Sequence, residues 1–206
     1  MIPRFGKETG LLLIDVQQGV NVLEHWGGPT GRRNNPGCDD EIGSLIKAFR
    51  REGLKLFYTQ HDSREAASPL KLSLPTGEWL PGLEPAEGDV VVRKDVNSAF
   101  VGTDMELRLR QHGVSRLVVC GYFTNFCVET SVRMAGNMGY DTYLAHEACA
   151  TTNRVGLDGT DHDPQIVHDL AVASMHGEFC TALGTTDLVA LTGSHAPDLE
   201  RVQGNE

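Results

Sequence analysis

Short runs of apolar residues recur along the chain, and stretches with helical spacing of apolar residues separate them. We predict strands at six runs, which are residues 11–14, 54–58, 90–92, 117–120, 142–145 and 179–183. Helical spacing marks residues 42–49, 105–111 and 126–138, and a fourth helix that begins at 163–164. Apolar strands that alternate with helices are typical of a parallel sheet covered on both faces. The pattern therefore predicts an α/β fold with three layers, α/β/α, and a parallel sheet of about six strands.

Residues typical of helix boundaries support these helices. Thr103 followed by Glu106 forms the pattern of a capping box at the start of the second helix, and Gly113 is placed to end it. Asp163 and Pro164 form a common start of a helix. These boundary residues agree with the helical spacing of apolar residues, so two independent signals support each of these two helices.

A length of 206 residues suits one α/β domain, and no stretch with the composition of a linker divides the chain. We therefore predict a single domain over residues 1–206, with a polar tail from about residue 194. Residues 61–88 are rich in Pro, Gly and Ser and lack a helical period. Loops of this length in compact domains are usually functional. We expect this loop to be a lid or a binding wall, and we expect substrate specificity to depend on it, on residues 18–36 and on a partner subunit.

Composition and charge restrict the partners and the compartment. A net charge of −10 argues against a nucleic-acid partner, because phosphate binding requires clustered Lys and Arg. Five widely spaced cysteines without a C-x-x-C pair favour reduced thiols over a disulfide framework. No apolar run reaches the roughly 20 residues of a membrane-spanning helix, and residues 1–8 lack the apolar core of a signal peptide. We expect a cytoplasmic protein that associates with no membrane.

Three residues with reactive side chains follow predicted strands, where parallel sheets place their sites. Asp15 follows the first strand, Lys94 the third and Cys127 the fourth. Thr124 or Asn125 is a good helix N-cap, which puts Cys127 in the first turn of the next helix. The helix dipole and the free N–H groups there lower a thiol pKa and can bind an oxyanion. Cys127 is then a candidate nucleophile, with Asp15 as its base and Lys94 to polarise a carbonyl.

Each of these residues also has a structural interpretation. A cysteine is often a small buried apolar residue, an aspartate after a strand is often a cap, and a lysine is usually a solvated surface charge. We assign the structural interpretation to Cys120, Cys149 and Cys180. For Asp15, Lys94 and Cys127, the joint placement after strands favours catalysis.

Three stretches carry a resemblance to a known family. They are residues 12–17, then Lys94 with 98–103, then 121–128, and the segment from Gly139 matches as well. Over roughly residues 8–190 the chain resembles the isochorismatase-like cysteine hydrolases, a superfamily that includes nicotinamidases and N-carbamoylsarcosine amidases. The resemblance implies a triad of Asp15, Lys94 and Cys127 that forms a covalent acyl-enzyme. It also implies a cis peptide bond at Tyr122-Phe123, with the backbone N–H groups of Phe123 and Cys127 as the oxyanion hole.

The chain departs from the family in its metal motif. Nicotinamidases carry Asp-x-His after the second strand, whereas residues 59–63 here read Thr-Gln-His-Asp-Ser. The acidic cluster at 158–163 does not match a Ca²⁺ loop, and His162, His168 and His176 lack zinc spacing. We therefore predict no metal and no cofactor, although His61 with a distant ligand such as Asp161 or His162 stays an alternative.

The predicted substrate is a small molecule whose contacts are harder to read from sequence. The candidates for substrate binding are Gln17, Trp26, His61, Trp79, Phe100 and Tyr122. Trp26 and Trp79 are equally plausible as loop anchors, and His61 as a surface residue. Because many relatives form dimers or tetramers, the resemblance also implies a homo-oligomer.

We predict hydrolysis of a small amide, a ureide or a related carbonyl compound through an acyl-enzyme on Cys127. The alternative within enzymes is an isochorismatase-type hydrolase that cleaves an enol ether of an anionic substrate, because isochorismatases proper need no catalytic cysteine. An alternative of another class is a nucleotide-binding module. It lacks support, because neither Gly-x-Gly-x-x-Gly nor a Gly-Lys-Ser/Thr loop is present.

Overall fold

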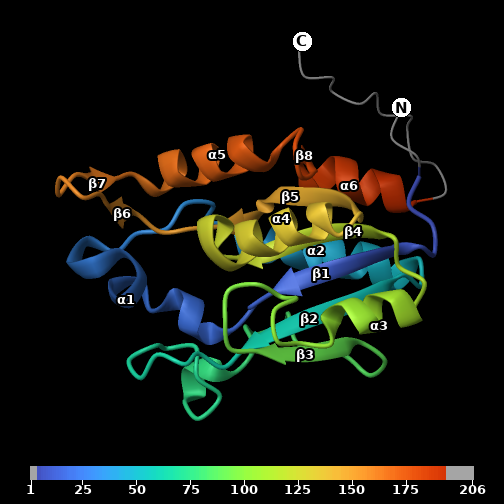
Figure 1. The fold of residues 1–206 in the computed structure, drawn as a ribbon, viewed down its shortest axis with the longest axis horizontal. Coiled ribbons are helices and arrows are strands. Elements are labelled where there is room, and N and C mark those ends of the chain that lie inside the picture. Colours follow the sequence, from blue (N-terminus) through green and yellow to red (C-terminus); the bar gives the residue numbers. More distant parts are fainter. Residues whose placement is uncertain (1–3, 194–206) are drawn as a thin grey trace.

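The centre of the protein is a parallel sheet of six strands, as the sequence predicts. A computed structural model describes residues 4–193, and the predicted polar tail from about residue 194 lies outside them. The sheet order is β3-β2-β1-β4-β5-β8, and every pairing within it is parallel (Figure 1). Its strands are β1 (Thr9–Ile14), β2 (Lys55–His61), β3 (Val90–Lys94), β4 (Arg116–Tyr122), β5 (Asp141–Ala150) and β8 (Thr181–Leu183).

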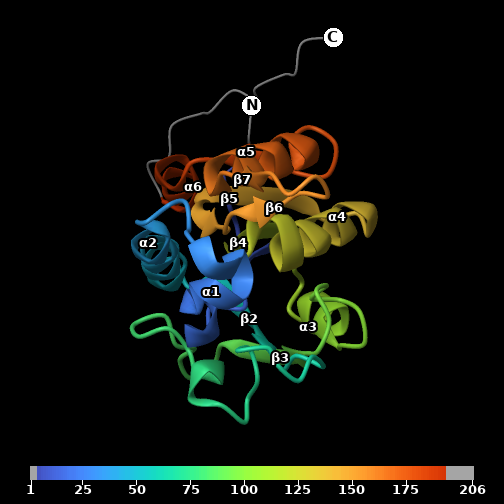
Figure 2. The same ribbon diagram turned by 90° about the vertical axis from the view of Figure 1, so that its left-hand side faces the viewer.

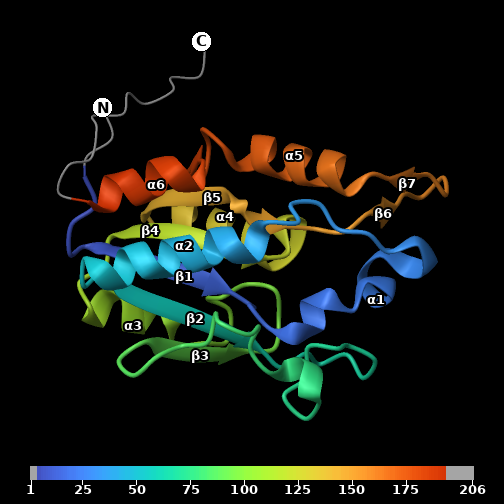
Figure 3. The ribbon, with the colours of Figure 1, turned by 180° about the vertical axis from the view of Figure 1, so that it is seen from behind.

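Helices cover both faces of this sheet and complete the three layers. The helices are α1 (Leu23–Gly27), α2 (Cys38–Arg51), α3 (Met105–Gln111), α4 (Glu129–Asn137), α5 (Pro164–Met175) and α6 (Thr185–Thr192). Helices α2 and α6 pack together on one face, and α3 and α4 lie on the other, with α5 beside α4 (Figures 2 and 3). None of the helices within residues 4–193 is long and apolar enough to cross a membrane.

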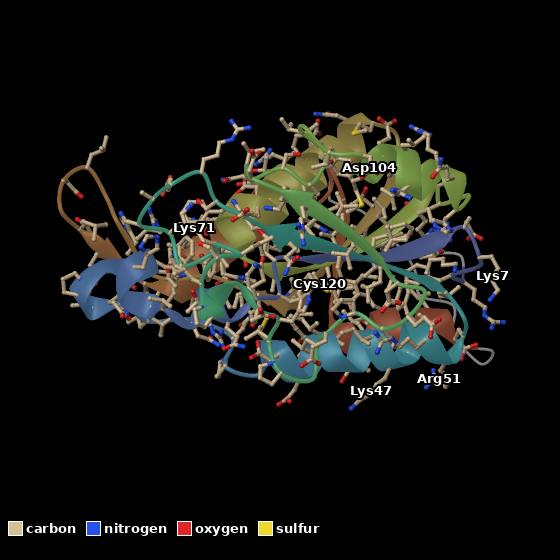
Figure 4. All side chains as sticks on the ribbon, turned by 90° about the horizontal axis from the view of Figure 1, so that it is seen from below. Lys7, Lys47, Arg51, Lys71, Asp104 and Cys120 are labelled. Carbon is tan, nitrogen blue, oxygen red and sulfur yellow. The ribbon has the colours of Figure 1, made fainter. Side chains whose placement is uncertain are left out.

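The core lies on both sides of the central strands, because β1 and β4 carry apolar residues on both faces after their first residues. All six residues of β1 are buried, and so are Leu117 to Tyr122 of β4. Figure 4 shows Cys120 in the middle of the molecule, whereas Lys47 and Arg51 of α2 point away from it. All five cysteines are buried and free, so their thiols are not joined in disulfides.

A predicted helix cap and a predicted strand end differ from the structure. The N-cap position of α3 is Asp104 and not Thr103, whose hydroxyl donates to the carbonyl of Ala99 (2.6 Å) and accepts a long hydrogen bond from the N–H of Met105 (3.4 Å). Strand β5 also continues past its predicted end at residue 145, through a register shift against β4. The polar pair His146 and Glu147 interrupts the apolar run there, so the hydrophobic pattern alone ends the strand too early.

The turn that follows β4 is a π-helical turn, Thr124–Val128, rather than the start of a regular helix. It leads into α4, so the single helix predicted over residues 126–138 is divided in two. Gly121 of β4 has φ 119°, and a Cβ there would lie 2.2 Å from the carbonyl oxygen of Ile14. Only glycine therefore allows the end of β4 to pass this close to the end of β1.

A further element is a small antiparallel pair, β6 (Arg154–Val155) and β7 (Asp161–His162), which the sequence did not predict. It extends beside α1, beyond the carboxyl ends of the central strands (Figures 1 and 2). Asp161 at its base pairs with Arg32 (2.7 Å), and Asp163 caps α5 by accepting from the N–H of Gln165 (2.8 Å). Asp161 and Asp163 of the acidic cluster at 158–163 thus make structural contacts, which the sequence did not predict.

Candidate active site

The carboxyl ends of β1, β2, β3 and β4 meet at one edge of the sheet, and each contributes to a single polar cluster. Asp15 follows β1, His61 and Lys94 end β2 and β3, and Cys127 lies in the turn after β4. These side chains are buried, and the ligand atoms of Asp15, His61 and Cys127 lie within 4.8 Å of one another. The site lies where the chain switches from one half of the sheet to the other, the usual position in open α/β sheets.

Lys94 is at the centre of this cluster, and its contacts define its protonation. Its Nζ lies 2.7 Å from Asp15 Oδ2, 3.0 Å from His61 Nδ1 and 3.1 Å from the carbonyl oxygen of Val96. An ammonium has three protons, so Lys94 donates to the oxygens of Asp15 and Val96 and has a third proton for His61 Nδ1 in the tautomer that leaves this atom free to accept. Burial lowers the pKa of Lys94, but the charge of Asp15 and its hydrogen bond outweigh burial, and the pKa is raised.

His61 Nδ1 faces both charged groups of the cluster. It lies 3.0 Å from Lys94 Nζ and 3.2 Å from Asp15 Oδ2, so it accepts from the lysine in one tautomer and donates to the carboxylate in the other. His61 is buried and lines the cavity described below, so it is not the surface residue that its sequence context also allowed.

Asp15 is held as a carboxylate by contacts on both of its oxygens. Thr59 donates to Oδ1 (2.6 Å), Lys94 donates to Oδ2, and the backbone N–H of Asp15 donates to the Thr59 hydroxyl (3.0 Å). Burial alone raises the pKa of Asp15, but Lys94 and His61 outweigh it and the pKa falls to about 2. Asp15 has φ 51°, in the left-handed region that aspartate tolerates better than most residues.

Cys127 is a neutral thiol in this arrangement, contrary to the expected low pKa. Burial and the Asp15 carboxylate raise its pKa well above the usual value and outweigh the opposing charge of Lys94. Neither Thr124 nor Asn125 is the N-cap, and the position is occupied by Phe123 without a side-chain cap. The expected helix N-terminus is thus a buried π-helical turn, in which Sγ lies 3.8 Å from His61 Nδ1. The peptide bond between Tyr122 and Phe123 is cis.

A cavity of about 610 Å³ opens above the cluster and has room for a small substrate. Trp26, Phe123 and Phe126 form an aromatic wall, in which the rings of Trp26 and Phe123 are 4.9 Å apart. Residues 63–70 contribute to the opposite side, as expected for part of the 61–88 loop. Among the predicted substrate-binding residues, Trp26, His61 and Tyr122 line the cavity, and Tyr122 also donates its hydroxyl to Asp39.

The other three predicted substrate contacts do not line it. Gln17 is fully buried and bridges two segments, because Oε1 accepts from the N–H of His61 (2.7 Å) and Nε2 donates to the carbonyl of Gly77 (2.9 Å). Trp79 packs edge-on against Tyr58, and Phe100 stacks on Tyr140. These side chains support the loops around the site, and strand and loop positions alone do not distinguish that role from substrate binding.

The cluster also has a composition that metals bind, with one ligand atom each from Asp15, His61 and Cys127. Lys94 opposes such binding, because its ammonium already lies within hydrogen-bonding distance of Asp15 Oδ2 and His61 Nδ1. A metal ion on those two atoms would have to displace a buried positive charge. Asp62, the neighbour of His61, is exposed and accepts from the N–H of Leu72 (3.1 Å), so it is not a fourth ligand.

Comparisons with known proteins agree with this geometry. The family model described as Isochorismatase domain matches residues 9–187. The isochorismatase family protein YrdC of Bacillus subtilis is 32% identical over 186 residues, which cover 89% of this chain and 95% of that protein. The ureidoacrylate amidohydrolase RutB of Rhizobium rhizogenes is 30% identical in an alignment that covers 92% of this chain and 85% of that protein. A solved structure from Chromobacterium violaceum, described as a putative hydrolase of the isochorismatase family, is 37% identical in sequence. The superposition covers 93% of this chain and 97% of that chain, with a TM-score of 0.84. The chain therefore belongs to the isochorismatase family of hydrolases.

Proposed function

We propose that this protein hydrolyses a small amide or ureide through a covalent acyl-enzyme on Cys127. The observation that carries the proposal is the burial of Asp15, Lys94 and Cys127 in one cluster beneath a cavity of about 610 Å³. A thiol, a carboxylate and an ammonium in contact provide the nucleophile, the base and the electrostatic support that amide cleavage needs. The similarity to a ureidoacrylate amidohydrolase supports a C–N bond as the target.

The reaction begins when Sγ of Cys127 attacks the carbonyl carbon and its proton passes to Asp15. Because the thiol pKa is raised and the Asp15 pKa is about 2, this transfer is unfavourable in the resting enzyme. The proton therefore leaves sulfur as the S–C bond forms, while Lys94 stabilises the developing charge. The backbone N–H groups of Phe123 and Cys127 donate to the oxyanion, and both residues line the cavity.

Collapse of the tetrahedral intermediate breaks the C–N bond and leaves a thioester on Cys127. Asp15 returns its proton to the departing nitrogen and becomes a carboxylate again. Asp15 then takes a proton from a water molecule that attacks the thioester, and this proton returns to sulfur as the acid is released. Over the full cycle one water is consumed, and Asp15, Lys94 and Cys127 regain their initial protonation.

The test compares ammonia release from a panel of small amides and ureides by wild-type, Cys127→Ala and Cys127→Ser proteins. Loss of the nucleophile should lower turnover by several orders of magnitude. Cys180→Ala is the matched control, because this thiol is buried but does not line the cavity. Intact-mass spectrometry of the wild type during turnover should show the acyl group on the protein. Near-normal turnover by Cys127→Ala would contradict the proposal and favour the isochorismatase-type cleavage of an enol ether.

A further inference from the structure

A buried serine on α4 contacts two of the segments that carry the catalytic cluster. The Ser131 hydroxyl donates to the carbonyl oxygen of Cys127 (2.6 Å) and accepts from the backbone N–H of Ala99 (3.0 Å). Ser131 is fully buried and lies outside the set of residues that line the cavity. One hydroxyl therefore joins the turn of the nucleophile to the loop that follows Lys94, at a position that the substrate does not reach.

Half of this arrangement is common in helices, where a serine hydroxyl often donates to the carbonyl of the preceding turn. Ser174 of α5 is an exposed example, with the carbonyl of Leu170 as its acceptor (2.7 Å). The bond from Ser131 to Cys127 is of the same kind. The bond to Ala99 is not, because it joins α4 to a segment 32 residues away in sequence. That second bond requires an explanation beyond the helix itself.

The loop bound by Ser131 also determines where Lys94 can donate. Lys94 Nζ donates to the carbonyl of Val96 (3.1 Å), which lies in the same loop as Ala99. The carbonyl of Ala99 accepts from the Thr103 hydroxyl (2.6 Å), so both polar groups of the Ala99 backbone are bound. The bond to Ser131 thus fixes the Val96 carbonyl relative to α4, and with it one of the acceptors that hold the ammonium in the cluster.

We propose that Ser131 is a positioning residue, which holds the nucleophile turn and the loop after Lys94 together so that the ammonium stays beside the Cys127 thiol. This inference rests on the proposed function, because it concerns the geometry of the same cluster. The positive charge of Lys94 stabilises the thiolate that forms during attack. Without the hydroxyl, the buried N–H of Ala99 has lost its acceptor, and the loop must move to find another.

The test measures how fast iodoacetamide alkylates Cys127 at one fixed pH, because this small amide probes the thiol whatever the substrate is. The S–C bond forms as iodide leaves and the thiol releases its proton, and peptide mass mapping reads the product at Cys127. We expect Ser131→Ala to slow alkylation and to lower kcat by about 10- to 100-fold, as expected for a displacement of about 1 Å. KM should stay close to the wild-type value, since Ser131 does not line the cavity.

Two further variants separate positioning from a merely structural role. Ser131→Thr keeps a hydroxyl and should retain most of the alkylation rate, whereas Ser131→Cys keeps the size with only a weak donor and acceptor and should lose much of it. A loosened fold would give the opposite result for Ser131→Ala, because greater access to Cys127 speeds alkylation. Thermal unfolding of each variant shows how much stability it has lost.

Ser174→Ala is the control for the bond within a helix, and Thr192→Val removes a buried hydroxyl of α6 that donates to the carbonyl of Val189 (2.8 Å). Both should leave alkylation and kcat unchanged. Unchanged or faster alkylation in Ser131→Ala, or equal slowing in Ser131→Thr, would overturn the inference.

The same measurements distinguish this inference from the proposed function. Ammonia release that depends on Cys127, together with wild-type alkylation and kcat in Ser131→Ala, would overturn the role of Ser131 and leave the proposed function intact. Slow alkylation in Ser131→Ala, together with near-normal turnover by Cys127→Ala, would do the reverse.

Discussion

Within the cluster, the protonation of each residue depends on its neighbours more than on its own side chain. Asp15 is buried and nevertheless a carboxylate, because Lys94 and Thr59 donate to it. Cys127 is buried near that carboxylate and is therefore a thiol. We expect this thiol to resist oxidation in the absence of substrate, since the thiolate is the reactive form.

Asp15 and Cys127 should behave as one unit when they are removed together. Asp15→Asn lacks the base, and Cys127→Ala lacks the proton that this base accepts, so neither residue has a catalytic role without the other. We expect Asp15→Asn to lower kcat by several orders of magnitude and the double variant to be scarcely worse than Cys127→Ala. Steady-state kinetics measure this, with thermal unfolding as a control because Asp15→Asn leaves Lys94 without its counterion. Fully additive losses would place Asp15 outside the reaction.

His61 should matter chiefly as the acceptor for the third proton of Lys94. Asn can place its side-chain oxygen near the position of Nδ1, whereas Leu has no acceptor and leaves a buried ammonium N–H unsatisfied. We expect His61→Asn to keep kcat within about tenfold of wild type and His61→Leu to lower it by about 10- to 100-fold. The pH–rate profile gives a second readout, because loss of this acceptor shifts the limb that reports Lys94. Equal kcat values for the two variants would argue against this role.

Sequence position was enough to select Asp15, Lys94 and Cys127, because strand ends in a parallel sheet converge. It was not enough to predict the direction of the Cys127 pKa shift, which depends on burial and on a carboxylate distant in sequence. The role of Gln17 was missed for a similar reason. Its partners, His61 and Gly77, lie 44 and 60 residues away in sequence, and no local pattern indicates them.

At the scale of elements, the strands and long helices follow the hydrophobic pattern, whereas the connections that shape the site do not. The π-helical turn Thr124–Val128 and the β6–β7 pair depend on tertiary contacts, and their short sequences carry no period. The β6–β7 pair positions Arg154, which lines the cavity and was absent from the sequence-based candidates. The sequence around it gave no signal that distinguishes an arginine in a cavity from one on the surface.

Helix α5 packs onto the nucleophile turn through a buried histidine, which makes this contact dependent on pH. His168 Nδ1 lies 2.9 Å from the Thr124 hydroxyl, and burial lowers the pKa of His168 to about 4. The folded protein therefore binds a proton at this site less readily than the unfolded chain, whose histidine pKa is about 6.5. The stabilising contribution of neutral His168 is complete above about pH 6.5 and is lost as the pH falls towards 4.

Urea unfolding at a series of pH values checks this contribution. Between pH 7 and pH 4.5 the wild type should lose up to about 3 kcal/mol of unfolding free energy through His168, in addition to the losses from carboxylates. The Gln side chain of His168→Gln does not titrate in this range. Between pH 7 and pH 4.5 this variant should therefore lose less unfolding free energy than the wild type, and the difference should equal the contribution of His168. Parallel pH dependences for the two proteins would mean that His168 titrates normally in the folded state.

At the scale of the whole molecule, the sheet order explains why the site forms where it does. The chain leaves β1 towards β2 and β3 on one side and later continues to β4, β5 and β8 on the other, so the ends of β1 and β4 border a crevice. The walls of that crevice come from residues 20–26, 63–70, 95–97 and 122–127 and from Arg154. Because the residues that line the cavity are spread over distant segments, the family is evident from sequence, whereas the substrate is not. The homo-oligomer and the cytoplasmic location stay predictions.

The hydrolytic activity of the protein should not require a metal ion. The group that most resembles a metal site is Asp15, His61 and Cys127, and these residues are also the candidates for catalysis. Lys94 Nζ already contacts Asp15 Oδ2 and His61 Nδ1, so a bound metal would face a buried positive charge and would have to displace it. A metal ion would also coordinate the sulfur that attacks the carbonyl, so added zinc should inhibit.

The measurement is ammonia release after dialysis against a strong chelator, with elemental analysis to confirm that metal is absent. We expect unchanged turnover after dialysis and a loss of turnover when zinc is added, which the chelator reverses. Lys94→Met provides a matched comparison, because it removes the competing ammonium and should increase zinc affinity in calorimetry even though the variant is inactive. Turnover that disappears on dialysis and returns with zinc, iron or manganese would show that the metal, and not Lys94, polarises the carbonyl. The mechanism would then require Lys94 to be neutral or displaced in the active enzyme, which its contacts with Asp15 and Val96 oppose.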